Sequence, residues 1–141
     1  MSNFAVFMAG NATTNETIKY VASKRYMEKG KPVEWEIKPI DSDLDEAIRK
    51  DCTKRVPVPG KRGQVTQETD TDKYIGKMCV ACTVFPNLND AELQDFYGVK
   101  SADALLKKML LPGEYTEYKA KVMEVNGYDM SMEELVDEAK N

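Results

Sequence analysis

The sequence predicts an α+β fold in a single domain, 1–141, with an N-terminal β-hairpin followed by a bundle of short α-helices. The hairpin is predicted because three apolar residues of 33–37 (Val33, Trp35 and Ile37) alternate with two glutamates, the period of a half-buried strand. From residue 41 onward, apolar residues instead recur at spacings of three and four, which is the helical period. A length of 141 residues suits one domain with its own core.

The hairpin is expected within 16–40. Its first strand lies around Ile18 and Tyr20, where the alternation is less strict, and a turn-rich connection at 28–32 leads into the second strand. A two-stranded hairpin is not stable alone, so helices must cover its apolar face. Residues 1–15 precede these patterns, and we expect them to be flexible.

The remainder, 41–141, is predicted to be mainly helical. Each helix has a start signal, which is a side chain that can accept a hydrogen bond from a free backbone N–H, or a proline in the first turn. In the first helix, Leu44, Ala47, Ile48 and Cys52 form one apolar stripe. The predicted helices cover 41–55 (capped by Asp41 or Ser42), 71–84, a segment from Asn89 to Gly98, one from Ser101, one from Pro112 to Asn126, and one from Ser131.

The segment after the first helix is predicted to be an extended, exposed connector. It contains two prolines and two glycines between 56 and 63, which exclude regular helix. Four cations lie in or next to it, so the 54–63 connector could contact phosphate or an acidic protein surface. A purely solvated connector explains it equally well. These candidate partner-binding residues are Lys54, Arg55, Lys61 and Arg62.

The side chains needed for common catalytic sites are missing or unsuitably placed. There is no histidine, which excludes the usual triads and zinc hydrolases. Cys79 and Cys82 have the spacing of a redox or zinc half-site, but they fall inside a predicted helix, on its apolar stripe, and only Cys52 remains as a further thiol. We therefore predict buried structural cysteines, no catalytic residue, no metal, no cofactor, and a protein that is not an enzyme.

Charge and composition favour a protein-binding module. The formal net charge is -4, so nucleic acid is not the expected partner. No signal peptide or membrane span is recognisable, so we expect a cytoplasmic protein. The eight methionines suit surfaces that accept varied apolar partners. The final predicted helix, with Met132, Leu135 and Val136 on an acidic background, is the best candidate partner-binding surface.

Ordered strings along 20–141 resemble the XkdN-like family of phage tail assembly chaperones, whereas residues 1–15 match least. The strings are SKR at 23–25, GKPVEWEI at 30–37, CTKRV at 52–56, PGKRG at 59–63, TDKY at 71–74, FPNLNDAELQD at 85–95, MLLPGEY at 109–115 and VNGY at 125–128.

The resemblance implies a chaperone that binds the tape-measure protein in the cytoplasm of a bacterial host and assists tail morphogenesis without catalysis. It also implies the tail tube protein as a further possible partner, and homo-oligomers are compatible with it. Two alternatives remain open. One is a structural tail component retained in the particle, and the other is a nucleic-acid-binding regulator that uses the basic 54–63 connector.

Overall fold

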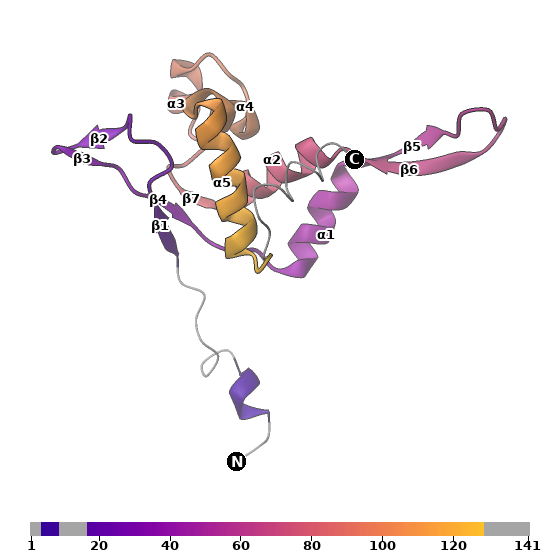
Figure 1. Ribbon diagram of the computed structural model, residues 1–141, viewed down its shortest axis with the longest axis horizontal. Helices are drawn as coiled ribbons and strands as arrows, with labels where there is room; N and C mark the ends of the chain where they lie inside the picture. The colour runs from indigo at the N-terminus through magenta and orange to yellow at the C-terminus, as the bar shows by residue number, and fades with distance from the viewer. Residues whose placement is uncertain (1–3, 9–16, 129–141) are drawn as a thin grey trace.

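The computed structural model describes residues 4–8 and 17–128, and its centre is a three-stranded antiparallel sheet in the order β1-β4-β7 (Figure 1). β1 (Ile18–Tyr20) pairs with β4 (Trp35–Ile37), with Tyr20 opposite Trp35. The predicted pairing of the two strands within 16–40 is therefore confirmed. The connection between them carries a small ribbon of its own, β2 (Met27–Glu28) and β3 (Lys31–Pro32), closed by two residues with positive φ.

The third strand, β7 (Thr83–Phe85), was not predicted. It pairs with the other edge of β4, and it begins directly where α2 (Thr71–Cys82) ends. The helix predicted over 71–84 is therefore two residues too long. Thr83 is already extended, with φ -84° and ψ 112°, and Phe85 precedes a proline, which disfavours helical backbone.

The other helices begin close to their predicted caps. In α1 (Ser42–Asp51), the carboxylate of Asp41 accepts a hydrogen bond from the Leu44 N–H, but the helix stops before Thr53, four residues short of the predicted end at 55. The cap of α3 (Ala91–Phe96) is Asp90, one residue beyond the predicted Asn89. Two further helices follow, α4 (Ala102–Met109), capped by Ser101, and α5 (Pro112–Val125), which starts at the predicted proline.

The core lies between the sheet and the helices α2, α4 and α5. Trp35 and Ile37 point into it from β4 and are 1% and 0% exposed. Tyr118 of α5 packs edge-on against Trp35, with the ring centroids 5.3 Å apart. The α+β architecture is thus confirmed, with strands first and helices after. The buried hydrophobic cluster contains Ala22, Trp35, Ile37, Cys52, Tyr74, Met78, Cys79, Cys82, Leu88, Ala102, Leu105, Leu106, Met109, Leu110, Tyr118, Val122 and Met123.

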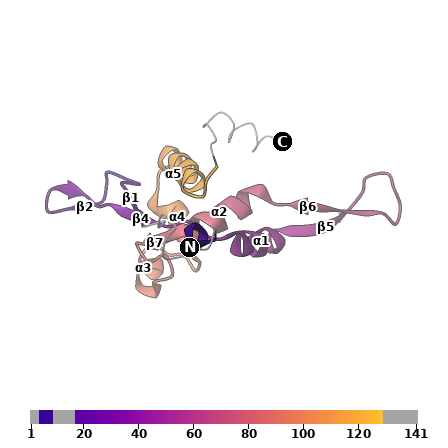
Figure 2. The same ribbon diagram turned by 90° about the horizontal axis from the view of Figure 1, so that it is seen from below.

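The segment predicted to be an extended connector is extended and mostly exposed, but it is not a simple connector, because it forms the end of one strand and the loop of a second hairpin. β5 (Thr53–Pro57) and β6 (Val65–Thr69) pair in register from Thr53 opposite Thr69 to Pro57 opposite Val65. We call 53–69 the arm. Figures 1 and 2 show that it extends away from the helices, attached at the ends of α1 and α2.

Two of the sequence predictions fall on residues that the structure does not describe. The flexible segment expected at 1–15 overlaps the described part only at 4–8, which holds a single 3-10 turn, η1 (Ala5–Phe7). The final helix expected from Ser131 lies entirely outside the described residues, together with Met132, Leu135 and Val136.

Candidate functional site

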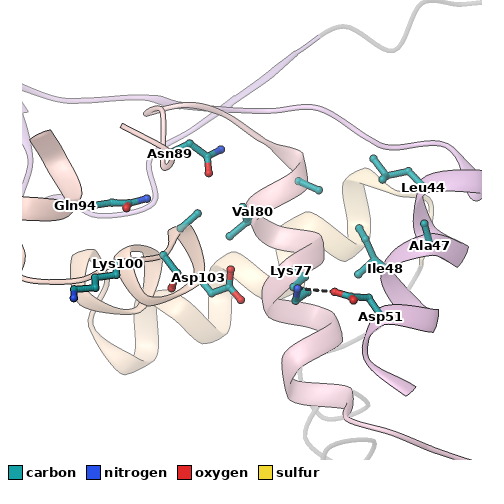
Figure 3. A pocket seen from close by; sticks show the side chains of 13 residues that line it. Leu44, Ala47, Ile48, Asp51, Lys77, Val80, Asn89, Gln94, Lys100 and Asp103 are labelled. Atoms are coloured by element: carbon teal, nitrogen blue, oxygen red, sulfur yellow. Dashed lines mark hydrogen bonds and ion pairs between the residues drawn. The ribbon is translucent and has the colours of Figure 1, made fainter. Parts of the chain in front are cut away.

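A groove of about 770 Å³ lies between α1, α2 and the segment from α3 to the start of α4 (Figure 3). Its apolar wall on α1 is formed by Leu44, Ala47 and Ile48, which share one helix face because they are three and four residues apart. α2 contributes Val80 and Ala81 from the other side. Leu44 is 44% exposed, so the groove presents real apolar surface to solvent.

This wall is open because α1 packs on α2 through a polar contact. The Tyr74 hydroxyl of α2 donates a hydrogen bond to the Asp45 carboxylate, and the Arg49 guanidinium lies over the Tyr74 ring, 4.3 Å from its centroid. Arg49 also donates to the Tyr74 hydroxyl at 2.9 Å. Asp45 and Arg49 lie on a different face of α1 from the stripe of Leu44, Ala47 and Ile48. As a result, no residue of α1 is fully buried. Leu44 and Ala47 are exposed, and Ile48 packs only partly buried against the core, although such a stripe normally faces a core along its length.

At one end of the groove, a lysine and an aspartate form an ion pair. The Lys77 ammonium donates to the Asp51 carboxylate at 2.7 Å, and Figure 3 shows Lys77 between Asp51 and Asp103. The hydrogen bond to Lys77 lowers the pKa of Asp51, and the same bond raises the pKa of Lys77. Both groups therefore stay charged near neutral pH, and they form a polar rim beside the apolar wall.

The three cysteines are buried, as predicted. Cys79 and Cys82 are 0% exposed and Cys52 is 5% exposed. Burial, reinforced by the neighbouring Cys82, raises the pKa of the Cys79 thiol to about 12, and burial also raises the pKa of Cys82. A thiol that resists ionisation is a poor nucleophile and a poor metal ligand. Within 4–8 and 17–128, no three His, Cys, Asp or Glu side chains gather where they could hold a metal ion.

The four predicted partner-binding cations all lie on the arm. Lys54 and Arg55 are exposed on β5, opposite Glu68 and Gln67, and Lys61 and Arg62 are exposed in the loop that joins the strands. The arm carries these four cations against one carboxylate, a net charge of +3 on a chain whose total is -4. The cations thus share one projecting element, but the structure gives them no common pocket.

Sequence reasoning missed the groove. Its apolar wall was recognised as a helical stripe, but a stripe does not reveal whether the same chain covers it. The residues beside the stripe do carry a signal that the stripe can stay exposed. Asp45 and Arg49 are one turn apart on an adjacent face, so polar contacts of these two side chains can attach the helix to the rest of the domain. No helix in the described part of the chain combines the length and the apolar character needed to cross a bilayer.

A small sheet covered by helices, with an open apolar groove and a charged arm, has the features of a protein-binding domain. Its family is shown by comparison with known proteins. Residues 4–140 match the family model described as "Phage XkdN-like tail assembly chaperone protein", and the chain belongs to this family of phage tail assembly chaperones.

Two curated relatives from Bacillus subtilis (strain 168) match almost the whole chain. The chain is 29% identical to "Phage-like element PBSX protein XkdN", over 99% of this chain and 94% of that protein. It is 31% identical to "Uncharacterized protein YqbN", over 99% and 93%. The crystal structure of the protein YqbN superposes with a TM-score of 0.76 at 25% identity, covering 92% of this chain and 99% of that one.

Proposed function

We propose that this protein binds the tape-measure protein of its phage or prophage in the bacterial cytoplasm and keeps it soluble during tail assembly, without catalysis. The observation that carries the proposal is the open apolar groove on a member of the tail assembly chaperone family. A long client with exposed apolar stripes aggregates unless those stripes are covered, and covering them needs surface rather than chemistry.

The groove suits an amphipathic helix of the client. From Leu44 to Asp51 its α1 wall spans about 10 Å, or two turns of helix, at 1.5 Å per residue. Two turns present apolar side chains at i, i+3, i+4 and i+7, the usual anchors of a helix held in a groove. The rim formed by Lys77, Asp51 and Asp103 can then pair with polar groups of the client and fix its register.

The arm supplies a second surface of different character. Its cations are exposed on both the strand and the connecting loop, so they can meet an acidic segment of a tail protein, either the tape-measure protein or the tail tube protein. Contacts of this kind mainly accelerate encounter and weaken with added salt. We assign affinity to the groove and steering to the arm.

The test is co-expression of the full chain with the tape-measure protein, scoring soluble client and co-purification. L44E and A47E each place a carboxylate in the apolar wall, and both positions are exposed, so the fold should tolerate them. We expect each to weaken binding at least about tenfold, because a carboxylate buried without a partner is unfavourable. The matched control is L111E, a leucine 51% exposed and outside the groove.

The outcomes separate the candidate functions. Loss of co-purification in the groove variants but not in L111E supports the proposal. If the wild-type chain neither solubilises nor retains the client, client binding is abandoned, and stoichiometric presence in purified tails would identify a structural tail component. Salt-sensitive retention on DNA that disappears in K61E/R62E would instead favour the nucleic-acid-binding regulator.

A further inference from the structure

The hydrogen bonds at the two ends of the arm determine which backbone groups of its strands face outward. At the base, the Asp70 N–H donates to the Cys52 carbonyl at 2.8 Å. Beyond the outermost ladder pair, the Val58 N–H donates to the Gln64 carbonyl at 3.1 Å. In an antiparallel ribbon, pairs that exchange hydrogen bonds alternate with pairs whose N–H and C=O groups point away from the partner strand. The outward pairs of the arm are therefore 53 with 69, 55 with 67, and 57 with 65.

The two outer edges of the arm differ in what they offer to another strand. On β5, the outward positions include Pro57, which has no N–H to donate, and a second proline follows at 59. On β6, the outward residues are Val65, Gln67 and Thr69, and the first two of them are exposed. The arm extends away from the helices (Figure 1), and in the described part of the chain this edge of β6 pairs with no further strand. β6 therefore presents an open strand edge, whereas proline interrupts the edge of β5.

The charges around the β6 edge select the kind of strand that can add to it. Arg55 lies directly opposite Gln67, on the same face of the ribbon. A strand added to β6 lies about 10 Å from β5, which is two strand spacings, and a long arginine side chain and a carboxylate together can bridge this distance. Lys61 and Arg62 are exposed in the loop at the outer end of the edge. The net charge of +3 on the arm therefore favours an extended segment with acidic side chains.

We propose that the β6 edge of the arm binds an extended acidic segment of a partner protein by adding it as a third strand. Backbone hydrogen bonds to Val65, Gln67 and Thr69 attach the segment, while Arg55 and the loop cations select acidic side chains. A third strand also supplies pairing that an isolated two-stranded hairpin lacks. This inference deepens the proposed function and rests on it for the origin of the segment, which is a tail protein. Strand addition follows the electrostatic encounter and adds short-range contacts to it.

The test uses the full-length chain and a synthetic peptide of about eight residues in which aspartate and valine alternate. Binding is followed by NMR titration, and the bound strand is located by nuclear Overhauser contacts. We expect contacts from the peptide backbone to β6 and none to the outward positions Thr53 and Arg55 of β5. A peptide with lysine in place of aspartate should bind at least about tenfold more weakly, because like charges then face one another.

A proline at the open edge is the discriminating change. Gln67→Pro removes one outward N–H without removing a ladder bond to β5, as proline on an edge strand does. We expect it to weaken peptide binding at least about fivefold, whereas the matched control Gln67→Thr keeps the N–H and should stay within about twofold. Cross-strand contacts between Lys54 and Glu68 show whether the arm is still folded in each variant. If Gln67→Pro loses them, Val65→Pro, at another outward position, replaces it.

The outcomes are separable from those of the co-expression experiment. Leu44→Glu, in the groove, should bind the peptide as the wild type does, so a failed client interaction at the groove leaves the strand test intact. Contacts to β6 that are lost with proline and kept with threonine support the inference. Equal binding by Gln67→Pro and the wild type would show attraction by charge alone and overturn it, as would absence of binding at millimolar peptide. Contacts between two copies of the chain at this edge, detected in a mixture of labelled and unlabelled protein, would assign the edge to a second copy and also overturn it.

Discussion

Two hydroxyl groups meet where α2 passes into β7 against α5, and they allow a sharp test of the core. Thr83 Oγ1 donates to the Cys79 carbonyl at 2.6 Å, and the Tyr118 hydroxyl lies 2.6 Å from the same Thr83 oxygen. Because the Thr83 proton is used on Cys79, Tyr118 must be the donor in the second bond. Tyr118 is 0% exposed, so water cannot replace Thr83 as its partner.

The direction of these bonds makes the two single substitutions unequal. Tyr118→Phe removes a donor but keeps the ring against Trp35, and Thr83 keeps its bond to Cys79. We expect a loss of about 0.5–1.5 kcal/mol in the free energy of unfolding. Thr83→Val preserves shape but leaves the buried Tyr118 hydroxyl without an acceptor and the Cys79 carbonyl without this donor. An unpaired buried group costs about 1–3 kcal/mol, so Thr83→Val should be the more damaging change.

The double variant tests the reasoning more strictly than either single change. In the Thr83→Val background, Tyr118→Phe removes the orphaned hydroxyl, so it should be neutral or stabilising. The coupling energy between the sites should then be about 1–2 kcal/mol, well above the roughly 0.3–0.5 kcal/mol by which independent sites deviate from additivity.

Urea unfolding measures this coupling directly. Trp35 is the sole tryptophan and is 1% exposed, so its fluorescence reports the core, and circular dichroism follows the helices. A change of 1 kcal/mol moves the midpoint by about 0.5 M urea for a slope near 2 kcal/mol/M, and the slope should stay constant across the variants. Additive single effects, or a Tyr118→Phe change that is the more damaging of the two, would refute the assigned direction of the bonds.

Two further outcomes follow from a cap and from a buried thiol. Ser101 Oγ accepts the Ala104 N–H at 3.2 Å, so Ser101→Ala should lower the free energy of unfolding by about 1 kcal/mol, seen as a lower urea midpoint, and an unchanged midpoint would contradict this role. The pKa of Cys79 is raised from 9.0 to about 12, so its contribution is complete below pH 9 and is lost as the pH rises toward 12. From pH 9 to 10, the wild-type free energy of unfolding should fall by about 1 kcal/mol more than that of Cys79→Ala, and equal slopes would show that the thiol is not the cause.

Helix starts could be predicted because a cap is a local hydrogen bond. The side chains of Asp41 and Ser101 accept an N–H three residues later, and Pro112 fits the first turn of α5. The one-residue error at α3 has the same origin. Asn89 and Asp90 are equally good caps, and Asn89 is drawn instead into a turn in which its N–H donates to the Asn87 side chain at 3.1 Å. Adjacent cap residues of equal quality cannot be ranked from local chemistry alone.

The strand β7 could not be predicted, because its cause is distant in the sequence. Thr83 pairs with Ile37, a residue that lies far before it in the chain, on the edge of β4 that β1 leaves free. β7 has only three residues, and two of them, Val84 and Phe85, are 51% and 46% exposed. Such a short segment has no alternation of buried and exposed residues from which a strand could be predicted. The helix predicted from the apolar pattern of α2 therefore ran past the true helix end, because that end is determined by pairing with a strand that is distant in the sequence.

The stripes of α1 and α4 show how the same pattern can lead to different outcomes. Leu105 and Met109 of α4 are 0% and 5% exposed, whereas Leu44, in a stripe of the same spacing on α1, is 44% exposed. Periodicity fixes which residues share a face, but the polar contact of Asp45 with Tyr74 leaves Leu44 and Ala47 on this face of α1 exposed, while Ile48 packs partly against the core. In this protein, the proposed binding surface is indicated by an apolar stripe that the domain does not cover, and not by a sequence motif.

The arm was missed as a hairpin for a comparable reason. A strand is recognised in a sequence when one of its faces meets a core, because burial imposes alternation of apolar and polar residues. The arm meets no core, so β6 has no apolar residue between Val65 and its end at Thr69, and β5 is broken by proline at its outer end. Prolines at the edge of a ribbon and exposed cations hinder indiscriminate pairing with other strands. An element with these features resembles a linker in the sequence, because no contact with a core imposes a period of two on its strands.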